Sequence, residues 1–336
     1  MKSKSFYKNS KKVVLHLTES GGGVLEYVKK IVESTPDIFH ILVMRKRSSF
    51  SNLDLSNIQN LQIEEWDGNL FNGIFKAINL YHKNNASYMH LHSSLAGLAR
   101  LTSTKIRFIY SPHCYAFERQ DFPFLVRATI FIIESILSIN TNKYLCVSKR
   151  EKELTKRFLK NSKILAVNFP TSEWKSQNPT NYIVSIGRIC SQKNPSEFIK
   201  IASIFRLMNP GIKFIWLGDG DLDLRKQLED NEIYVMGWMQ KEKLYTFISE
   251  AIAVLHTALW EGMPVIFSEV MASGVPLIVR DSRYLGNFGE PYIYKYSNVY
   301  EAAEWIQGQL SSQNRLKPLL FSWEEFAKSV SKLYTI

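Results

Sequence analysis

Two pairs of charged residues carry the plainest chemistry in this sequence. Arg188 and Lys193 follow an apolar run and precede a helix-like stretch, and two cations five residues apart at such a place suit a pyrophosphate group. Glu261 and Glu269 bracket the segment EGMPVIFSE, which follows another apolar run. A loop with two cations is often only a solvated loop. Acidic residues at both ends of an apolar segment do not identify a ligand. Neither pair alone therefore assigns a binding site.

Two glycine-containing loops are places where backbone can come close to a phosphate or a sugar. Gly21, Gly22 and Gly23 follow the first apolar run, and Gly218 and Gly220 enclose an aspartate after a later run. The first loop lacks the GxGxxG spacing of a dinucleotide-binding fingerprint. A tight turn explains each loop about equally well, so both interpretations stay open.

Three histidines fall on or next to apolar, strand-like runs. His113 ends one run beside Pro112 and is therefore the better candidate for a cleft residue, whereas His90 and His92 lie on one face of an earlier run. Because no third ligand is evident, we predict no metal site and a core or hydrogen-bonding role for His90.

The elements that would position these residues alternate between strands and helices. Strands are predicted at 11–20, 40–46, 61–66, 87–94, 106–115, 143–148, 163–169, 182–188, 213–220, 233–238, 253–258 and 276–281. Helices are predicted at 24–34, 73–84, 95–102, 122–139, 149–160, 195–208, 221–229, 241–250, near 269–273, and at 321–334.

This alternation predicts an α/β fold with parallel sheets covered on both faces. The polar segment 171–181 interrupts the alternation and is the predicted linker. We therefore expect two doubly wound, Rossmann-like domains, residues 1–172 and 173–320, that face one another across an interdomain cleft. Residues 321–336 are predicted to form a helix that packs back on the first domain.

Composition excludes several classes of protein. The chain has 336 residues, 45% of them hydrophobic and 22% charged, as in a soluble protein with a sizeable core. Its three cysteines are far apart, without metal or redox spacing. No long apolar run follows the N-terminal segment, so no signal peptide is predicted. The apolar stretch 124–139 contains Arg127 and Glu134 and is short for a bilayer span, which favours an amphipathic helix.

The basic excess lies in the first half of the chain. Residues 1–170 contain 25 Lys and Arg against 13 Asp and Glu, which leaves 17 and 18 of the totals for residues 171–336. Such an excess suits an anionic membrane or nucleic acid, and it also suits a solvated basic face that only maintains solubility. No recognised nucleic-acid-binding motif is present.

Taken together, the motifs resemble the retaining glycosyltransferases of family 4, which have the GT-B fold. The resemblance rests on the order strand–GRICSQKN–helix, strand–GDG, YVMGW, EGMPVIFSE and MASGVPLIV, and it is strongest over residues 182–281. VVLHLTESGGGVLEYV, HLHSSLAGLARL and YSPHCYAFER resemble the branch of the family that assembles bacterial surface polysaccharides.

The resemblance implies a role for each matching residue. Arg188 and Lys193 would neutralise the diphosphate of a nucleotide sugar, Glu261 would hold a donor-sugar hydroxyl, and Glu269 would hold the ribose. His113 would face the sugar and the acceptor. The remaining residues implied to bind the donor are Gly22, Gly23, Gly218, Met236, Gly237, Gly262, Met263, Pro264 and Val265.

The resemblance also implies the reaction and its partners. A hexose or N-acetylhexosamine would be transferred from a nucleotide sugar to a saccharide on polyprenyl diphosphate, with retention of the anomeric configuration. The donor in this family is usually a UDP-sugar. The product would serve O-antigen, capsule or exopolysaccharide synthesis. No cofactor or metal is implied. We therefore expect a cytoplasmic enzyme, peripheral on the inner face of the cytoplasmic membrane. Residues implied to dock there are Lys2, Lys4, Lys8, Lys11, Lys12, Arg45, Lys46, Arg47 and the segment 122–139.

Three departures and two alternatives remain. Thr257 stands where the family often has serine, Trp260 directly precedes Glu261, and Glu269-Val270-Met271-Ala272 replaces the common Glu-Ala-Met-Ala. None of these changes removes a polar group that the chemistry needs. A UDP-sugar 2-epimerase would share the fold but would not be expected to carry these motifs, and a non-catalytic sugar-nucleotide-binding subunit would not need all four charged residues.

Overall fold

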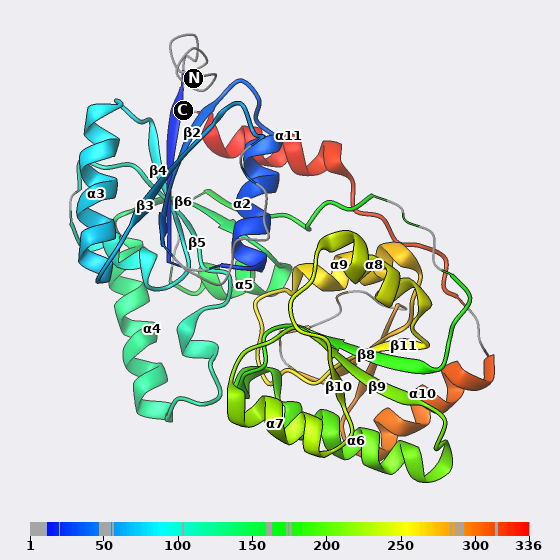
Figure 1. Cartoon of the computed structure of the whole chain (residues 1–336). Coiled ribbons are helices and arrows are strands. Elements are labelled where there is room, and N and C mark those ends of the chain that lie inside the picture. Colours follow the sequence, from blue (N-terminus) through cyan, green and yellow to red (C-terminus); the bar gives the residue numbers. More distant parts are fainter. Residues whose placement is uncertain are drawn as a thin grey trace. The chain divides into compact units, whose positions relative to one another are not determined.

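The computed structural model describes residues 12–19, 21–46, 55, 57–102, 104–158, 163–172, 174, 177–282, 284–285, 288, 292–312 and 315–335. The chain divides into two compact units (Figure 1). The first comprises Met1–Pro170 and Ser322–Ile336, and the second comprises Thr171–Phe321. Each unit is a parallel sheet with helices packed on it, so the predicted α/β class is confirmed.

The first unit is built on a seven-stranded sheet in the order β3-β2-β1-β4-β5-β6-β7. The strands are β1 (Val13–Thr18), β2 (Phe39–Arg45), β3 (Leu61–Trp66), β4 (Tyr88–His92), β5 (Phe108–Ser111), β6 (Thr141–Cys146) and β7 (Lys163–Ala166). All neighbouring pairs are parallel. The strand order reverses between β1 and β4, which is the switch point where doubly wound sheets bind ligands.

Helices and short 3₁₀ turns connect these strands. They are α2 (Gly23–Glu33), α3 (Leu70–Lys83), the 3₁₀ helix η1 (Ala96–Leu101), the 3₁₀ helix η2 (Ala116–Glu118), α4 (Phe124–Ser138), α5 (Lys149–Lys156) and α11 (Trp323–Tyr334). Helix α11, from the C-terminal end of the chain, belongs to the first unit (Figure 1). Its Tyr334 is buried and contacts His90 of β4.

The second unit is built on a six-stranded parallel sheet in the order β10-β9-β8-β11-β12-β13. The strands are β8 (Tyr182–Ile186), β9 (Lys213–Leu217), β10 (Tyr234–Val235), β11 (Ala253–His256), β12 (Leu277–Arg280) and β13 (Ile293–Tyr296). The helices are the 3₁₀ helix η3 (Ser191–Lys193), α6 (Pro195–Met208), α7 (Leu222–Asp230), α8 (Lys241–Glu250), α9 (Val265–Ser273) and α10 (Val299–Ser312).

The central strands of both sheets are buried on both faces, which explains why they read as continuous apolar runs. Every residue of β1, with the sequence VVLHLT, is buried, as is every residue of β4. A strand covered by helices on both sides needs apolar side chains at successive positions, not alternate ones. The buried histidines inside these strands, His16, His90 and His92, are therefore unusual.

Three expectations from the sequence are corrected. Helix α9 begins at Val265, not near residue 269, because Pro264 occupies its N-cap and the apolar run that follows is its first turn. Strand β13 and helix α10 were not predicted at all. The small-residue stretch expected to form an ordinary helix at 95–102 is the 3₁₀ helix η1.

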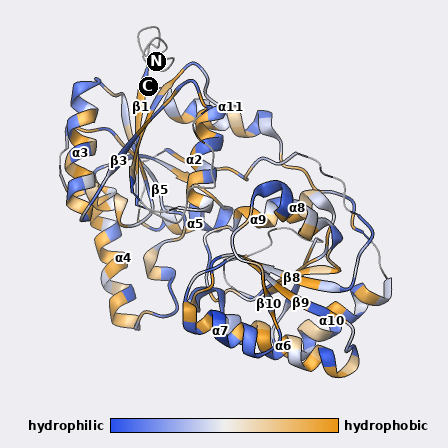
Figure 2. Ribbon diagram, in the orientation of Figure 1, coloured by the Kyte–Doolittle hydropathy of each residue, from blue (hydrophilic) through white to orange (hydrophobic). Residues whose placement is uncertain are grey.

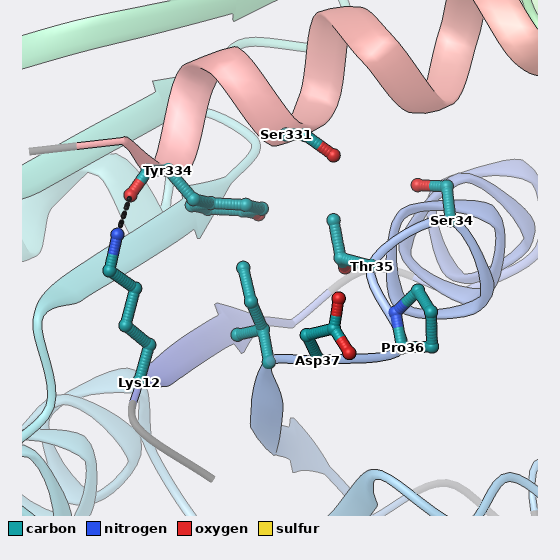
Figure 3. A pocket seen from close by; sticks show the side chains of 8 residues that line it. Lys12, Ser34, Thr35, Pro36, Asp37, Ser331 and Tyr334 are labelled. Carbon is teal, nitrogen blue, oxygen red and sulfur yellow. Dashed lines mark hydrogen bonds between the residues drawn. The ribbon is translucent and has the colours of Figure 1, made fainter.

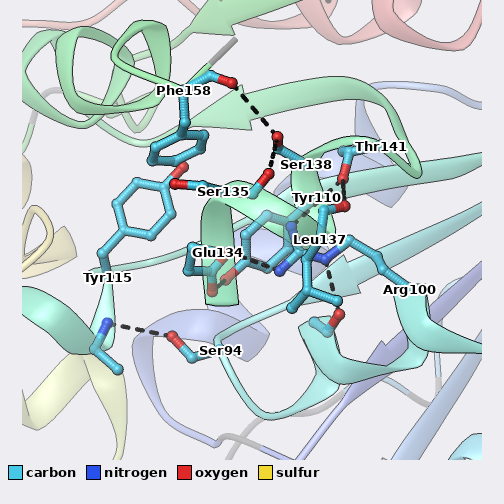
Figure 4. Close-up of polar contacts among 12 residues, drawn as sticks. Ser94, Arg100, Tyr110, Tyr115, Glu134, Ser135, Leu137, Ser138, Thr141 and Phe158 are labelled. Carbon is cyan, nitrogen blue, oxygen red and sulfur yellow. Dashed lines mark hydrogen bonds and ion pairs between the residues drawn. The ribbon is translucent and has the colours of Figure 1, made fainter. Parts of the chain in front are cut away.

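Helix α4 is held to the first unit by a buried ion pair. Arg100 donates to Glu134 at 2.8 Å, and the Tyr110 hydroxyl donates to the other carboxylate oxygen at 3.1 Å (Figure 4). The guanidinium of Arg100 also lies 3.7 Å from the centre of the Tyr110 ring. Glu134 thus lies on the buried side of the helix. It is one of the two charged residues, with Arg127, for which a membrane span was not predicted.

Helix α4 is largely apolar (Figure 2), and its side away from Glu134 is exposed. Its exposed large side chains are Phe124, Leu125, Val126, Ile132, Ile133 and Ile136, with Ile139 directly after the helix. No helix among the described residues is both long and apolar enough to cross a bilayer.

Candidate functional site

The carboxyl ends of β8 and β11 meet at the switch point of the second sheet. These two strands are neighbours, while the chain leaving β8 and the chain leaving β11 run to opposite sides of the sheet. Strand β8 is followed by Gly187 and Arg188, and β11 is followed by Thr257. The predicted diphosphate loop and the predicted EGMPVIFSE loop therefore start side by side.

Lys193 and Glu261 form an ion pair at this place. Lys193 Nζ lies 2.5 Å from Glu261 Oε1, and the side chains are 16% and 14% exposed. Gly187 makes room for the lysine, because a Cβ at this glycine would lie 2.9 Å from Lys193 Cε. The two charges most strongly implicated by the sequence are thus in contact and still partly open to solvent.

Backbone contacts lock the two loops together. The Thr257 hydroxyl donates to the carbonyl oxygens of Lys193 at 2.7 Å and Asn194 at 3.1 Å. Gln192 accepts a backbone hydrogen bond from Leu259 and donates its side-chain amide to the carbonyl oxygen of Trp260. The hydroxyl that replaces the family's serine therefore positions the lysine segment against the glutamate loop.

His256 is a neighbour that the sequence did not reveal. Its Nε2 is buried without a hydrogen-bond partner among the described residues and lies 3.8 Å from Glu261 Oε1. Burial, and then the charge of Lys193, hold the pKa of His256 well below its usual value, so the ring is neutral at pH 7. A neutral ring beside Glu261 leaves Lys193 as the cation of this cluster.

Glu269 lies in the second turn of α9 and is engaged by α8. Its Oε1 accepts from Lys241 at 2.8 Å and from the Tyr245 hydroxyl at 3.1 Å. The ring of Tyr245 stacks on Trp174 at 4.2 Å, and the Trp174 indole donates to the Glu269 carbonyl oxygen. Lys241 and Tyr245 were not predicted, because nothing in the spacing of α8 connects them to a glutamate 24 or more residues later.

The loop before α9 brings its backbone to the same region. Gly262 and Met263 lead into Pro264, the N-cap, and no side chain caps the helix that starts at Val265. An uncapped helix N-terminus presents N–H groups and a positive dipole to an anion. All four of these predicted donor-binding residues thus lie between Glu261 and the first turn of α9.

The predicted glycines of this unit are required for close contact between loops. A Cβ at Gly218 would lie 2.1 Å from the carbonyl oxygen of Gly187, and Gly218 also pairs with Gly237 in an isolated bridge. Gly237 has φ +69° and Met236 is 42% exposed. Arg188 is exposed at the surface. The glycine at position 218 of the GDG loop is therefore explained by close packing of this loop on the loop after β8.

The predicted residues of the first unit lie at the equivalent edge of its sheet. Gly22, with φ +57°, is the N-cap of α2, and Gly23 is its first residue. His113 follows β5, is half-buried, and adopts φ +53°. The backbone N–H of the next residue, Cys114, donates to the buried carboxylate of Glu151 at 2.9 Å, which holds the strained turn.

His16 joins His90 and His92 as a third neighbouring histidine, which the sequence did not predict. Ring nitrogens of His16, His90 and His92 come within 4.8 Å of one another, which is close enough for a metal ion. Each nitrogen of the three rings, however, is already hydrogen-bonded to another side chain. The predicted hydrogen-bonding role of His90 is observed, with Tyr334 and Ser111 as its partners.

A pocket of about 300 Å³ lies at the other edge of the first sheet, near the starts of β1 and β2 (Figure 3). Its lining residues are Lys12, Ser34, Thr35, Pro36, Asp37, Ile38, Ser331 and Tyr334. None of the predicted site residues contributes to it. Of the basic residues expected to dock on a membrane, Lys2, Lys4, Lys8, Lys11 and Arg47 lie outside the described residues.

Comparison with known proteins is consistent with this geometry. Residues 169–290 match the family described as glycosyl transferases group 1. A protein of Klebsiella pneumoniae described as an uncharacterised 41.2 kDa protein in the cps region is 24% identical over 304 residues, 80% of each chain. A UDP-Gal:alpha-D-GlcNAc-diphosphoundecaprenol alpha-1,3-galactosyltransferase of Escherichia coli is 29% identical over 105 residues, 29% of this chain and 27% of that one.

Two solved structures share the fold over nearly the whole chain. Sucrose-phosphate synthase of Thermosynechococcus elongatus superposes with a TM-score of 0.80 at 16% identity, over 96% of this chain and 98% of its own. Anabaena Alr3699/HepE in complex with UDP and glucose superposes with a TM-score of 0.74 at 13% identity, over 96% and 97%. The fold is thus GT-B, and with the glycosyl transferases group 1 domain at residues 169–290 the chain is a glycosyltransferase.

Proposed function

We propose that the chain transfers a hexose or N-acetylhexosamine from a UDP-sugar to a lipid-linked saccharide, with retention of the anomeric configuration, during surface-polysaccharide synthesis. The observation that carries the proposal is the Lys193–Glu261 pair at the switch point of the second sheet. The pair offers one cation and one hydrogen-bond acceptor, which suit the negative charge and the hydroxyl groups of a sugar diphosphate.

Donor binding would exchange the partners of this pair. Lys193, and Arg188 of the same loop, would turn to the diphosphate, and the N-terminus of α9 would contribute its N–H groups. Glu261 would then accept a hydrogen bond from a sugar hydroxyl, Glu269 would accept from the ribose, and the backbone at 236–237 would hold the base. The Anabaena protein that shares the fold is described as a complex with UDP and glucose, which supports UDP as the nucleotide.

The chemical step needs a stabilised leaving group. The bond from the anomeric carbon to the diphosphate oxygen breaks, and a bond to the acceptor hydroxyl oxygen forms on the same face of the sugar. The acceptor proton passes to the departing phosphate oxygen. Lys193 stabilises the negative charge that grows on the diphosphate, without reorganisation of solvent at that moment.

The acceptor is proposed from chemistry at the first unit. The exposed apolar side of α4 suits insertion into the headgroup boundary of a membrane, and Arg45 and Lys46 add positive charge for anionic lipids. A saccharide on polyprenyl diphosphate sits at such a surface. The E. coli relative is named for transfer to a diphosphoundecaprenol-linked sugar, which supports this class of acceptor.

A panel of sugar nucleotides tests the proposal directly. The purified chain is incubated with UDP-hexoses and UDP-N-acetylhexosamines, each with and without polyprenyl-diphosphate-linked mono- and disaccharides. We expect one donor to give a longer lipid-linked saccharide with retained configuration by NMR. Release of a free epimerised sugar without any acceptor would contradict transfer and favour an epimerase.

A further inference from the structure

Four buried or half-buried histidines form one hydrogen-bonded chain through the first sheet. His40 Nδ1 lies 2.9 Å from His16 Nε2, His16 Nδ1 lies 2.9 Å from His92 Nε2, and His92 Nδ1 lies 3.0 Å from His113 Nε2. At the other end, His40 Nε2 lies 2.9 Å from the hydroxyl of Thr35. The chain runs from Thr35, which lines the pocket (Figure 3), to His113, which follows β5 at the opposite edge of the sheet.

All four rings are neutral at pH 7. His16, His40 and His92 are fully buried, and burial lowers their pKa values, to about 3 for His40. Burial also lowers the pKa of His113 to about 3. A neutral imidazole has one N–H donor and one bare acceptor nitrogen. Each contact in the chain therefore contains a single proton. Every ring must donate its N–H toward the same end of the chain.

Thr35 sets that direction. Its hydroxyl lies 2.7 Å from the carbonyl oxygen of Ile31, in the last turn of α2, and two oxygens this close need the hydroxyl proton between them. With its only proton used, Thr35 Oγ1 accepts from His40 Nε2–H. Each next ring then also carries its proton on Nε2, and His113 ends the chain with Nε2–H and a bare Nδ1.

His90 stabilises the same arrangement from the side. Its ring stacks on His92 with 4.2 Å between centroids, and its two nitrogens bond Tyr334 of α11 and Ser111 of β5. His90 therefore offers no hydrogen bond that would compete for the nitrogens of His92. Within the described residues, His113 Nδ1 has no partner, so the end of the chain is the place where an outside donor can bind.

We infer that the chain Thr35–His40–His16–His92 is a positioning device that fixes His113 as a hydrogen-bond acceptor. The inference rests on the proposed function for the identity of the donor, which is a sugar hydroxyl of the transfer reaction. A ring locked in one tautomer accepts from that hydroxyl in every molecule, whereas a ring free to exchange tautomers presents an N–H part of the time. Thr35, four hydrogen bonds away, is thus a positioning residue that touches no substrate.

The test compares Thr35→Val with Thr35→Ser. Valine keeps the shape and removes the acceptor that ends the chain, whereas serine keeps the hydroxyl. Tautomers are read by ¹⁵N NMR of histidine-labelled protein, with His113→Gln identifying the His113 signal. We expect only the Nε2–H form of His113 in the native and serine proteins and a mixture in the valine variant. In a transfer assay, kcat falls about tenfold in Thr35→Val, since one oriented hydrogen bond is lost, while UDP binding is unchanged.

The outcomes separate the inference from the proposed function. An Nδ1–H form of His113 in the native protein overturns the inference, even if transfer is observed. An Nε2–H form of His113 that persists alone in Thr35→Val also overturns it, because the threonine then does not set the tautomer. Zinc retained stoichiometrically through purification and lost in His16→Gln overturns it as well. An Nε2–H form without any transfer supports the device and contradicts the proposed function.

Discussion

At the scale of single residues, the proposed function rests on how two loops hold Lys193 against Glu261. Thr257 makes two hydrogen bonds to backbone carbonyl oxygens of the lysine segment, and its side chain is almost fully buried. The Lys193 carbonyl loses this partner if the hydroxyl is removed, whereas the Asn194 carbonyl still accepts from the backbone N–H of Glu197. The residue-scale account therefore predicts that this threonine matters for stability and for the site at once.

Thr257→Val tests this role with an isosteric change. We expect the free energy of unfolding to fall by about 1–3 kcal/mol, because the carbonyl oxygen of Lys193 loses its hydrogen bond. Thr257→Ser restores the hydroxyl and serves as the control. Urea unfolding followed by tryptophan fluorescence measures both variants, and equal stability of valine and native proteins would show that the hydroxyl holds nothing.

The sequence predicted these charged residues but not their neighbours. Glu261 and Lys193 stood out because charges next to apolar runs are conspicuous. His256 and Tyr245 did not, because one lies inside a buried strand and the other on an ordinary helix. Their proximity is created by the parallel sheet, which aligns strand ends that lie far apart in the chain.

At the scale of elements, α4 separates a buried charged side from an exposed apolar side. Glu134 fixes the helix through Arg100, and the large apolar residues on the other side are exposed. Phe124 and Leu125 at its start are 78% and 77% exposed. This arrangement predicts membrane binding through the first turn of the helix.

Phe124→Ser combined with Leu125→Ser tests that prediction. Co-sedimentation at low salt measures binding to vesicles in which roughly one-third of the lipid is anionic. We expect about a hundredfold weaker binding, since two large apolar side chains no longer leave water. Leu207→Ser, which removes an 87% exposed leucine from α6 of the second unit, is the matched control. Native protein that does not bind such vesicles would refute membrane docking.

Element boundaries were the weaker part of the sequence prediction. The apolar letters after Pro264 read as the continuation of a buried segment, although they are the first turn of α9. Strand β13 is only four residues long, and two of them are half-exposed, so it gives no clear apolar run. Long, strongly periodic helices such as α6 and α8 were placed at their observed bounds because their patterns repeat over several turns.

At the scale of the whole molecule, buried histidines make stability depend on pH. His16, His40, His90 and His92 are fully buried with pKa values lowered by burial. The unfolded chain takes up protons near pH 6.5 while the folded chain does not, so stability is present above pH 6.5 and is lost as the pH falls toward 3. Glu151 acts oppositely, since burial raises its pKa to about 7 and folding is favoured as the pH falls to about 4.5.

The histidines outnumber this glutamate, so we expect stability to fall in acid. Each buried histidine contributes a slope of about 1.4 kcal/mol per pH unit below pH 6.5. Urea unfolding at pH 7.5, 6.5 and 5.5 measures the effect. His40→Gln should reduce the slope of the unfolding free energy against pH by the contribution of one histidine. His82→Asn, on the exposed side of α3, should leave that slope unchanged. A stability that is constant from pH 7.5 to 5.5 would contradict neutral burial of these rings.

The central claim, that Lys193 stabilises a leaving diphosphate at the switch point of the second sheet, has one direct measurement. It is the steady-state rate of sugar transfer by Lys193→Ala beside Lys200→Ala, which removes an exposed lysine of α6. The account predicts that kcat falls by about a hundredfold or more for Lys193→Ala, as when a pre-placed group at a developing charge is removed, and is unchanged for Lys200→Ala. Undiminished transfer by Lys193→Ala would contradict it.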